Sequence, residues 1–243
     1  MKSKFIALAV ALFPACVVAQ TALPAGTIVP VQLERGLNAA KLRSGQEIKA
    51  RVTQDIPGTS VRKGAQVLGK VETATVPARG QAQLVFRFEA IEQHGHSIPF
   101  TADLRAVASP TEITDAETAM YGPDAGIDSN STITQQIGGD ELFRGGGPVE
   151  ARSSIVGRSN PDGALAQPSA NSEANCRGIL DGNNRPQALW LFSTDACGIY
   201  GFSRLRIEHA GRTMPVGTII ITSSNRKLNI NSGSGMLLRV QGS

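Results

Sequence analysis

Apolar and polar residues alternate along the first part of the chain, which is the period of a strand with one buried and one wet face. Residues 47–53 are the clearest case, because Ile48, Ala50 and Val52 alternate with charged or polar neighbours. The same period recurs over residues 29–33, 84–88 and 98–104. We predict strands in all four places, and one shared core could bury their apolar faces.

Glycine and proline mark turns between these strands. The motif Gln93-His94-Gly95-His96 predicts a tight reversal, which makes residues 83–104 a hairpin. The motif Leu23-Pro24-Ala25-Gly26 predicts a type I turn with proline second and glycine fourth. A similar run, Pro215-Val216-Gly217-Thr218, predicts a second turn followed by a strand.

The C-terminal part, residues 187–243, returns to strand patterns and predicts strands that complete the same core. An apolar run at 187–192 holds the single Trp of the chain, and further strands are predicted at 205–208, 218–222, 228–230 and 236–240. The last follows Ser232-Gly233-Ser234-Gly235, which indicates a turn or bulge. We therefore predict an all-β fold, an antiparallel β-barrel or sandwich whose first part is residues 20–108.

Residues 109–186 separate the two parts and are rich in Gly, Ser, Asn and Asp, with Tyr121 and Phe143 as the only aromatic residues. This composition predicts a long, partly disordered insertion. At its start, Ser109-Pro110-Thr111-Glu112 has the spacing of a capping box and predicts a short helix to about residue 120. The run at 145–147 lacks the ending of a phosphate loop and indicates a linker.

The first 19 residues have the features of a secretory signal peptide. Lys2 and Lys4 precede an apolar run, and Val17-Val18-Ala19 places small residues at a cleavage site. The apolar stretch is shorter than the roughly 20 residues that span a bilayer, so we predict no transmembrane helix in the mature chain, which would begin near Gln20. An alternative is lipidation at Cys16. The expected location is periplasmic, outer-membrane-associated or extracellular.

Several of these segments, in this order, resemble the TrbI family of conjugative-transfer proteins. The matching segments are 23–30, Gly45 with 50–55, 63–69, 84–86 and the Gly95 hairpin, which together span about a third of the chain. In that family they build the periplasmic β-barrel domain of a type IV secretion channel. The family's membrane anchor has no counterpart here, and Arg62 stands where the family usually has Pro. The resemblance implies a β-barrel and, as one alternative, a component of a secretion or conjugation channel.

Charge is unevenly distributed along the chain. The whole sequence has a formal net charge of +4, and loss of the leader removes two lysines. Basic residues dominate from residue 34 to 70, and acidic residues dominate from 109 to 186. We predict a basic binding face for an anionic envelope polymer or an acidic envelope protein, with solvated strand faces as the alternative explanation. The candidate residues are Lys41, Arg43, Lys49, Arg51, Arg62 and Lys63.

Two cysteines remain after the predicted cleavage, Cys176 and Cys197. In an exported chain, two thiols predict one disulfide, here closing a loop of about 20 residues. Cys197, His209 and Asp195 have the residue types of a thiol hydrolase, but pairing of Cys197 would silence the nucleophile.

The remaining candidate chemistry is weak. His94 and His96 flank a turn, with no third metal ligand near them in the sequence. Asp140 and Glu141 lie in the predicted mobile insertion, where a glycosidase's carboxylate spacing could not be held. We predict no catalytic residue, metal or cofactor, and no binding of nucleic acid, because the chain is exported and no aromatic residues accompany the cations.

The sequence thus favours a secreted or periplasmic, non-enzymatic envelope protein with a binding or structural role. A cell-wall hydrolase and a component of a secretion channel are the alternatives. Exposed strand edges would also permit homo-oligomers.

Overall fold

The computed structural model describes residues 22–117, 132–138, 141–144, 148–151, 154–160, 163–166, 187–193, 196–210 and 215–242. Residues 22–117 form seven strands and one helix. These are β1 (Ile28–Leu33), β2 (Leu37–Asn38), β3 (Glu47–Val52), β4 (Gln66–Thr75), β5 (Ala82–Gln93), β6 (His96–Pro99), β7 (Ala102–Ala108) and α1 (Pro110–Glu117).

Among the described residues, five short strands lie within the insertion and six in the C-terminal part. The insertion strands are β8 (Thr132–Gln135), β9 (Glu141–Arg144), β10 (Pro148–Ala151), β11 (Ser154–Asn160) and β12 (Gly163–Ala166). The C-terminal strands are β13 (Gln187–Trp190), β14 (Gly198–Tyr200), β15 (Leu205–Glu208), β16 (Ile219–Ser223), β17 (Asn229–Ile230) and β18 (Gly235–Val240).

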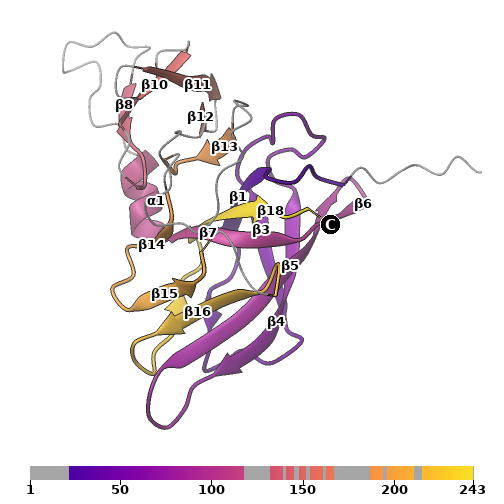
Figure 1. The fold of residues 1–243 in the computed structure, drawn as a ribbon, viewed down its shortest axis with the longest axis vertical. Coiled ribbons are helices and arrows are strands. Elements are labelled where there is room, and N and C mark those ends of the chain that lie inside the picture. Colours follow the sequence, from indigo (N-terminus) through magenta and orange to yellow (C-terminus); the bar gives the residue numbers. More distant parts are fainter. Residues whose placement is uncertain are drawn as a thin grey trace, which may run out of the picture.

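Ten strands form one nearly closed, barrel-like sheet (Figure 1). Its order is β14-β7-β18-β1-β3-β4-β5-β16-β15, and β6 pairs with β5. The described residues are mostly strands, so the predicted all-β fold is confirmed. All strand pairs in this sheet are antiparallel except β14 with β7, which makes the sheet mixed. The first and last described strands are neighbours in this sheet, because β1 pairs with β18 from Ile28 opposite Arg239 to Gln32 opposite Gly235.

The interior of the barrel is the main core, and the predicted alternation accounts for it. Ile48, Ala50 and Val52 of β3 are buried there, together with the apolar residues predicted on β1 and β5. The hairpin prediction is also confirmed, since β5 and β6 are joined at His94-Gly95, both with positive φ.

A second core lies on the outer face of β1, β7 and β18. Ile28, Ala106 and Leu237 project from these strands against Ile113 of α1 and against residues 189–192, where Trp190 contacts Phe192 edge-on. As a result β7 is buried along its whole length. The strand β13 packs outside the barrel and pairs with β12, so it belongs to a second, six-stranded sheet in the order β13-β12-β11-β10-β9-β8.

The predicted cap of the helix is confirmed, and the predicted turn before β1 has a different type. The hydroxyl Oγ of Ser109 accepts a hydrogen bond from the backbone N–H of Glu112 at 3.3 Å, and α1 begins at Pro110 as predicted. The first turn differs from the prediction, because Thr27 N–H donates to the Pro24 carbonyl and Gly26, at the third position, has a φ of 81°. Positive φ at that position defines a type II turn, one residue later than the predicted type I turn.

The insertion contains more strand structure than its composition predicts. Each of its described strands carries at least one apolar residue, and antiparallel pairing joins them in sequence from β8 to β12. The predicted linker at 145–147, the end of the helix near residue 120 and the predicted signal peptide lie outside the described residues.

Candidate functional site

The six basic residues predicted as a binding face lie along β3 and at its two ends, and we call them the β3 track. Because β3 alternates, the side chains of Lys49 and Arg51 project outward while their neighbours enter the core. Their side chains are 40% and 65% exposed. Lys41 and Arg43 precede the start of β3, and Arg62 and Lys63 follow its end.

A turn of four residues, Arg43 to Gln46, leads into β3. Gln46 N–H donates to the Arg43 carbonyl at 3.1 Å, and Gly45 at the third position has a φ of 81°. Gly45 N–H donates to the Val71 carbonyl of β4, and Val71 N–H donates back to the Gln46 carbonyl. Gly45 and Gln46 of the turn therefore both face Val71 of β4. This two-to-one pairing is a glycine bulge, and it fixes the turn against the sheet.

A second turn of the same kind, Arg62 to Ala65, lies at the other end of β3. Ala65 N–H donates to the Arg62 carbonyl at 3.1 Å, and Gly64 has a φ of 85°. Here the bulge faces Val52, the last residue of β3. Arg43 and Arg62 thus occupy the same position in two equivalent turns at opposite ends of one strand.

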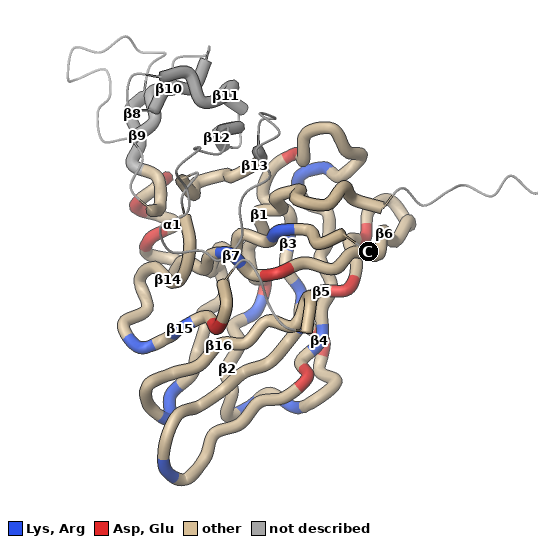
Figure 2. The backbone as a smooth tube through the Cα atoms, viewed as in Figure 1, with Lys and Arg blue, Asp and Glu red and all other residues tan. Residues whose placement is uncertain are grey.

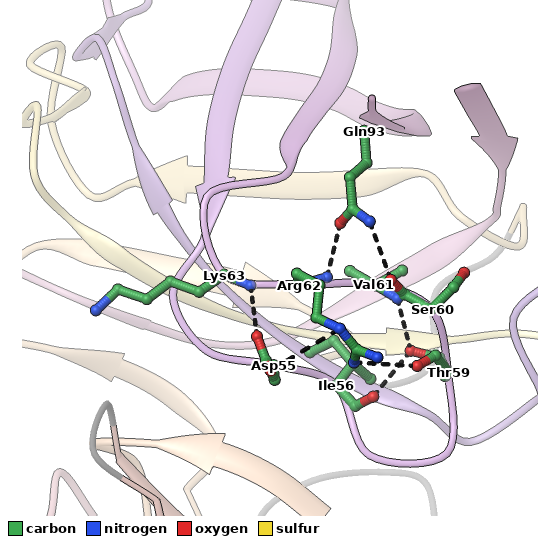
Figure 3. Close-up of polar contacts among 8 residues, drawn as sticks. All are labelled: Asp55, Ile56, Thr59, Ser60, Val61, Arg62, Lys63 and Gln93. Carbon is green, nitrogen blue, oxygen red and sulfur yellow. Dashed lines mark hydrogen bonds and ion pairs between the residues drawn. The ribbon is translucent and has the colours of Figure 1, made fainter. Parts of the chain in front are cut away.

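The loop before the second turn is held by further hydrogen bonds (Figure 3). Arg62 N–H donates to Oε1 of Gln93 at 2.7 Å, and Nε2 of Gln93 donates to the Ser60 carbonyl at 3.0 Å. Lys63 N–H donates to Oδ1 of Asp55 at 2.9 Å. Buried Ile56 and Val61 anchor both sides of the loop in the core.

Acidic residues accompany several cations of the track, and basic and acidic positions are interspersed along the barrel (Figure 2). Lys49 pairs with Glu47 at 3.1 Å, Arg51 with Glu34, and Arg62 approaches Asp55 at 4.0 Å. Within the described part of the chain, the side chains of Lys41 and Arg43 form no ion pair. An exposed ion pair stabilises the folded protein by at most about 1 kcal/mol, so an anionic ligand can compete with the acidic side chains for these cations.

A pocket of about 390 Å³ lies beside the start of the track. Arg35 and Lys49 carry its positive charges, and Glu34 and Glu47 carry its negative charges. The lining residues are Glu34, Arg35, Gly36, Leu37, Leu42, Gln46, Glu47, Ile48, Lys49 and Gln66.

A larger pocket of about 500 Å³, which we call the Val216 pocket, lies elsewhere on the barrel. No local pattern in the sequence predicts this pocket, because its residues come from five separate segments of the chain. They are Ala22, Leu23, Arg87, Phe88, Glu89, Pro99, Phe100, Thr101, Val216, Gly217, Val240 and Gln241.

An ion-pair network borders the Val216 pocket. Glu89 pairs with Lys70 at 2.9 Å and with Arg87 at 3.0 Å, and Arg87 also reaches Glu72 at 3.4 Å. The hydrogen bond from Lys70 lowers the pKa of Glu89, partial burial opposes this, and Arg87 lowers the pKa further. Glu89 is therefore ionised at neutral pH.

The enzymatic and metal candidates lie apart from both pockets. His94 is in the β5–β6 turn, His96 begins β6 and His209 follows β15. Cys197 is disulfide-bonded, and its backbone N–H donates to the Tyr200 hydroxyl at 3.0 Å. Its predicted partner Cys176 and the predicted triad residue Asp195 lie outside the described residues, so the pairing of Cys176 with Cys197 stays a prediction.

The described residues contain no group of three His, Cys, Asp or Glu side chains placed to hold a metal ion. Among the helices in the described ranges, none is long and apolar enough to cross a membrane. Comparisons with protein-family models, with curated proteins and with solved structures found no match for this chain.

Proposed function

We propose that this protein is exported to the cell envelope and acts there as a non-enzymatic binding protein, with the β3 track as its site for a linear anionic polymer. The observation that supports the proposal best is the linear arrangement of the six cations. A strand of six residues at about 3.4 Å per residue separates the two end turns by roughly 17 Å. A linear polyanion could contact both ends, whereas a small anion could contact only one.

The rigidity of the two turns also supports this proposal. Each turn is tied to a neighbouring strand by a pair of backbone hydrogen bonds, and the second is tied to Gln93 and Asp55 as well. Because the backbones of Arg43 and Arg62 are already held, binding would require their side chains but not their backbones to become ordered.

The test uses the mature chain with fluorescent dextran sulfate, and with uncharged dextran of the same length as the reference polymer. We expect binding of dextran sulfate alone, weakening as sodium chloride rises, since salt screens exposed charges beyond roughly 10 Å. The double variant Arg43→Ala/Arg62→Ala should lose about tenfold in affinity, because two exposed contacts of up to 1 kcal/mol each are removed.

A matched control removes the same charge elsewhere. Arg204→Ala/Arg206→Ala changes exposed arginines at β15, which lies four strands from β3 in the sheet order. If both double variants lose the same affinity, net charge and not the β3 track causes binding. Shortening of dextran sulfate or of purified cell-wall glycan during the assay would favour the hydrolase alternative.

The resemblance to the TrbI family supports a second candidate, a component of a secretion or conjugation channel. The turns at Gly26, Gly45 and Gly64 and the Gly95 hairpin, which carry that resemblance, all lie in the barrel-like sheet. Cross-linking in intact cells followed by mass spectrometry distinguishes the two: a channel component would be linked reproducibly to other secretion proteins.

Export itself is tested by sequencing the N-terminus of protein purified from the producing cells. We expect a start near Gln20. A start at acylated Cys16 would show a lipoprotein, and an intact leader would contradict export.

A further inference from the structure

Five exposed cations lie together at one end of the barrel, and we call them the basic end. Arg79 lies in the turn that joins β4 to β5, Arg204 and Arg206 lie at the start of β15, and Arg226 and Lys227 lie in the loop after β16. The β4–β5 turn is the lowest point of the barrel in Figure 1, and Figure 2 shows basic sequence there in blue.

Backbone hydrogen bonds hold these three segments against one another. The N–H of Ala82, the first residue of β5, donates to the Asn225 carbonyl at 3.1 Å. Ser224 N–H donates to the Arg204 carbonyl at 2.9 Å. The loop after β16 is also held internally, because Lys227 N–H donates to Oδ1 of Asn225 at 2.8 Å. The backbone that carries the cations is therefore fixed.

The charges of the basic end have no acidic counterpart. The three segments 73–82, 201–207 and 222–232 contain no Asp or Glu. Within the described part of the chain, none of the five cations forms an ion pair, whereas Lys49 and Arg51 of the β3 track do. Positive charges held side by side repel one another, so an anionic partner would relieve that repulsion.

The surroundings of the basic end favour a broad anionic surface over a small ligand or a protein. Neither of the two pockets described above is lined by residues 73–82, 201–207 or 222–232. Among the described residues, the one exposed large hydrophobic is Val216, which lies outside these segments. The basic end therefore has no apolar anchor of the kind on which protein interfaces depend. Exposed cations alone are sufficient to attract a layer of anionic lipid headgroups.

We propose that the basic end binds the surface of a bilayer rich in anionic phospholipid. Its cations contact the phosphate groups, and the barrel stays outside the hydrocarbon, because no large apolar side chain of these segments is exposed. Binding of this kind is electrostatic and is weakened by salt. This inference does not rest on polymer binding by the β3 track.

The test is co-sedimentation of the mature chain with vesicles of equal parts phosphatidylglycerol and phosphatidylcholine, and with vesicles of phosphatidylcholine alone. We expect binding to the anionic vesicles only, and its loss as sodium chloride rises. Glycerol 3-phosphate at constant ionic strength should not displace the protein, because one free headgroup cannot contact several cations. Equal binding to both kinds of vesicle, binding to neither, or displacement by glycerol 3-phosphate would overturn the proposal.

A double variant tests the residues themselves. Arg79→Ala/Arg226→Ala changes two exposed residues whose side chains form no hydrogen bond or ion pair within the described part of the chain, so the fold should persist. It should weaken binding to the anionic vesicles by about thirtyfold. Its affinity for dextran sulfate should be unchanged. An equal loss for dextran sulfate would show that the basic end attracts any polyanion and would overturn the lipid proposal.

Two matched variants separate position from charge. Lys70→Ala/Arg87→Ala removes the same charge from β4 and β5, and Lys70 lies roughly 17 Å before the end of β4, beyond the roughly 10 Å over which salt screens. Arg79→Lys/Arg226→Lys keeps both charges in place. Both variants should bind anionic vesicles as the wild type does. A thirtyfold loss in the first would assign binding to net charge, a similar loss in the second would exclude charge as its cause, and either would overturn the proposal.

Discussion

The backbone N–H of Gly217 donates a 3.0 Å hydrogen bond to Oδ1 of Asp103, a side chain that is 1% exposed on β7. In the equivalent turns at Gly64 and Gly233, the glycine N–H donates to a backbone carbonyl of a neighbouring strand. Gly217 leads into β16, and β16 and β7 are not hydrogen-bonded neighbours in the sheet. The carboxylate therefore supplies the acceptor that a paired strand carbonyl supplies in the other two turns.

Replacing Asp103 should show how much this contact contributes. We expect Asp103→Ala to lower the free energy of unfolding by about 1–3 kcal/mol, because a buried N–H loses its acceptor. Asp103→Asn retains a carbonyl oxygen and should cost less. Urea unfolding monitored by circular dichroism measures both variants. Equal losses for the two would show that the charge of Asp103, and not its acceptor for Gly217, stabilises the fold.

The strand alternation was sufficient to predict the inward face of the barrel but not its outer face. On β7, Asp103 and Arg105 occupy the positions that would be exposed on a sheet with one wet face. Both are buried, since Asp103 reaches Gly217 and Nε of Arg105 donates to the Ala196 carbonyl at 2.9 Å. The segments that cover them are about 90 to 115 residues away in sequence, as the separations of the two bonds show.

At the candidate sites, too, the sequence predicts what neighbouring residues form and does not predict contacts between distant segments. The cations of the β3 track could be found from the sequence because they are local to one strand and its turns. One acidic partner depends on strand register, because Glu34 meets Arg51 only where β1 pairs with β3. The Val216 pocket joins residues from both ends of the chain, for which no local pattern exists.

Two glycines should respond differently to substitution by alanine. A Cβ at Gly69 would lie 2.3 Å from the Arg87 carbonyl oxygen, where a bulge brings β4 close to β5. A Cβ at Gly64 would meet open space, and only its φ of 85° opposes alanine. We expect Gly64→Ala to cost about 1–2 kcal/mol and Gly69→Ala clearly more, since backbone must move. Thermal unfolding of both variants checks this order, and a reversed order would contradict the described register.

The lowered pKa of Glu89 predicts a stability that depends on pH. Folding favours the ionised carboxylate, so its contribution is present above the ordinary pKa of 4.5 and is lost as the pH falls through the lowered value. Glu89→Gln should therefore be less stable than the wild type at pH 7, by at most about 1 kcal/mol because Lys70 and Arg87 are exposed. The difference should vanish in acid. Urea unfolding from pH 3 to pH 7 measures it, and a gap that stays constant with pH would exclude the charge as its cause.

The last prediction concerns the partner of the disulfide at Cys197, which we expect to be Cys176. These are the two cysteines that remain once the leader is removed, and an oxidising compartment favours their pairing. Non-reducing digestion and mass spectrometry should find a peptide that joins the two residues. Replacing both by Ser should cost about 2–5 kcal/mol, because the bond constrains the unfolded chain more than the folded one.

A thiol probe separates this pairing from the hydrolase alternative. A nucleophilic Cys197 would be labelled in the native protein without reduction, whereas a bonded Cys197 would react only after a reductant is added. The double Ser variant should still bind dextran sulfate if the bond only stabilises the fold. Stoichiometric labelling of native Cys197 would refute the disulfide and revive the thiol hydrolase.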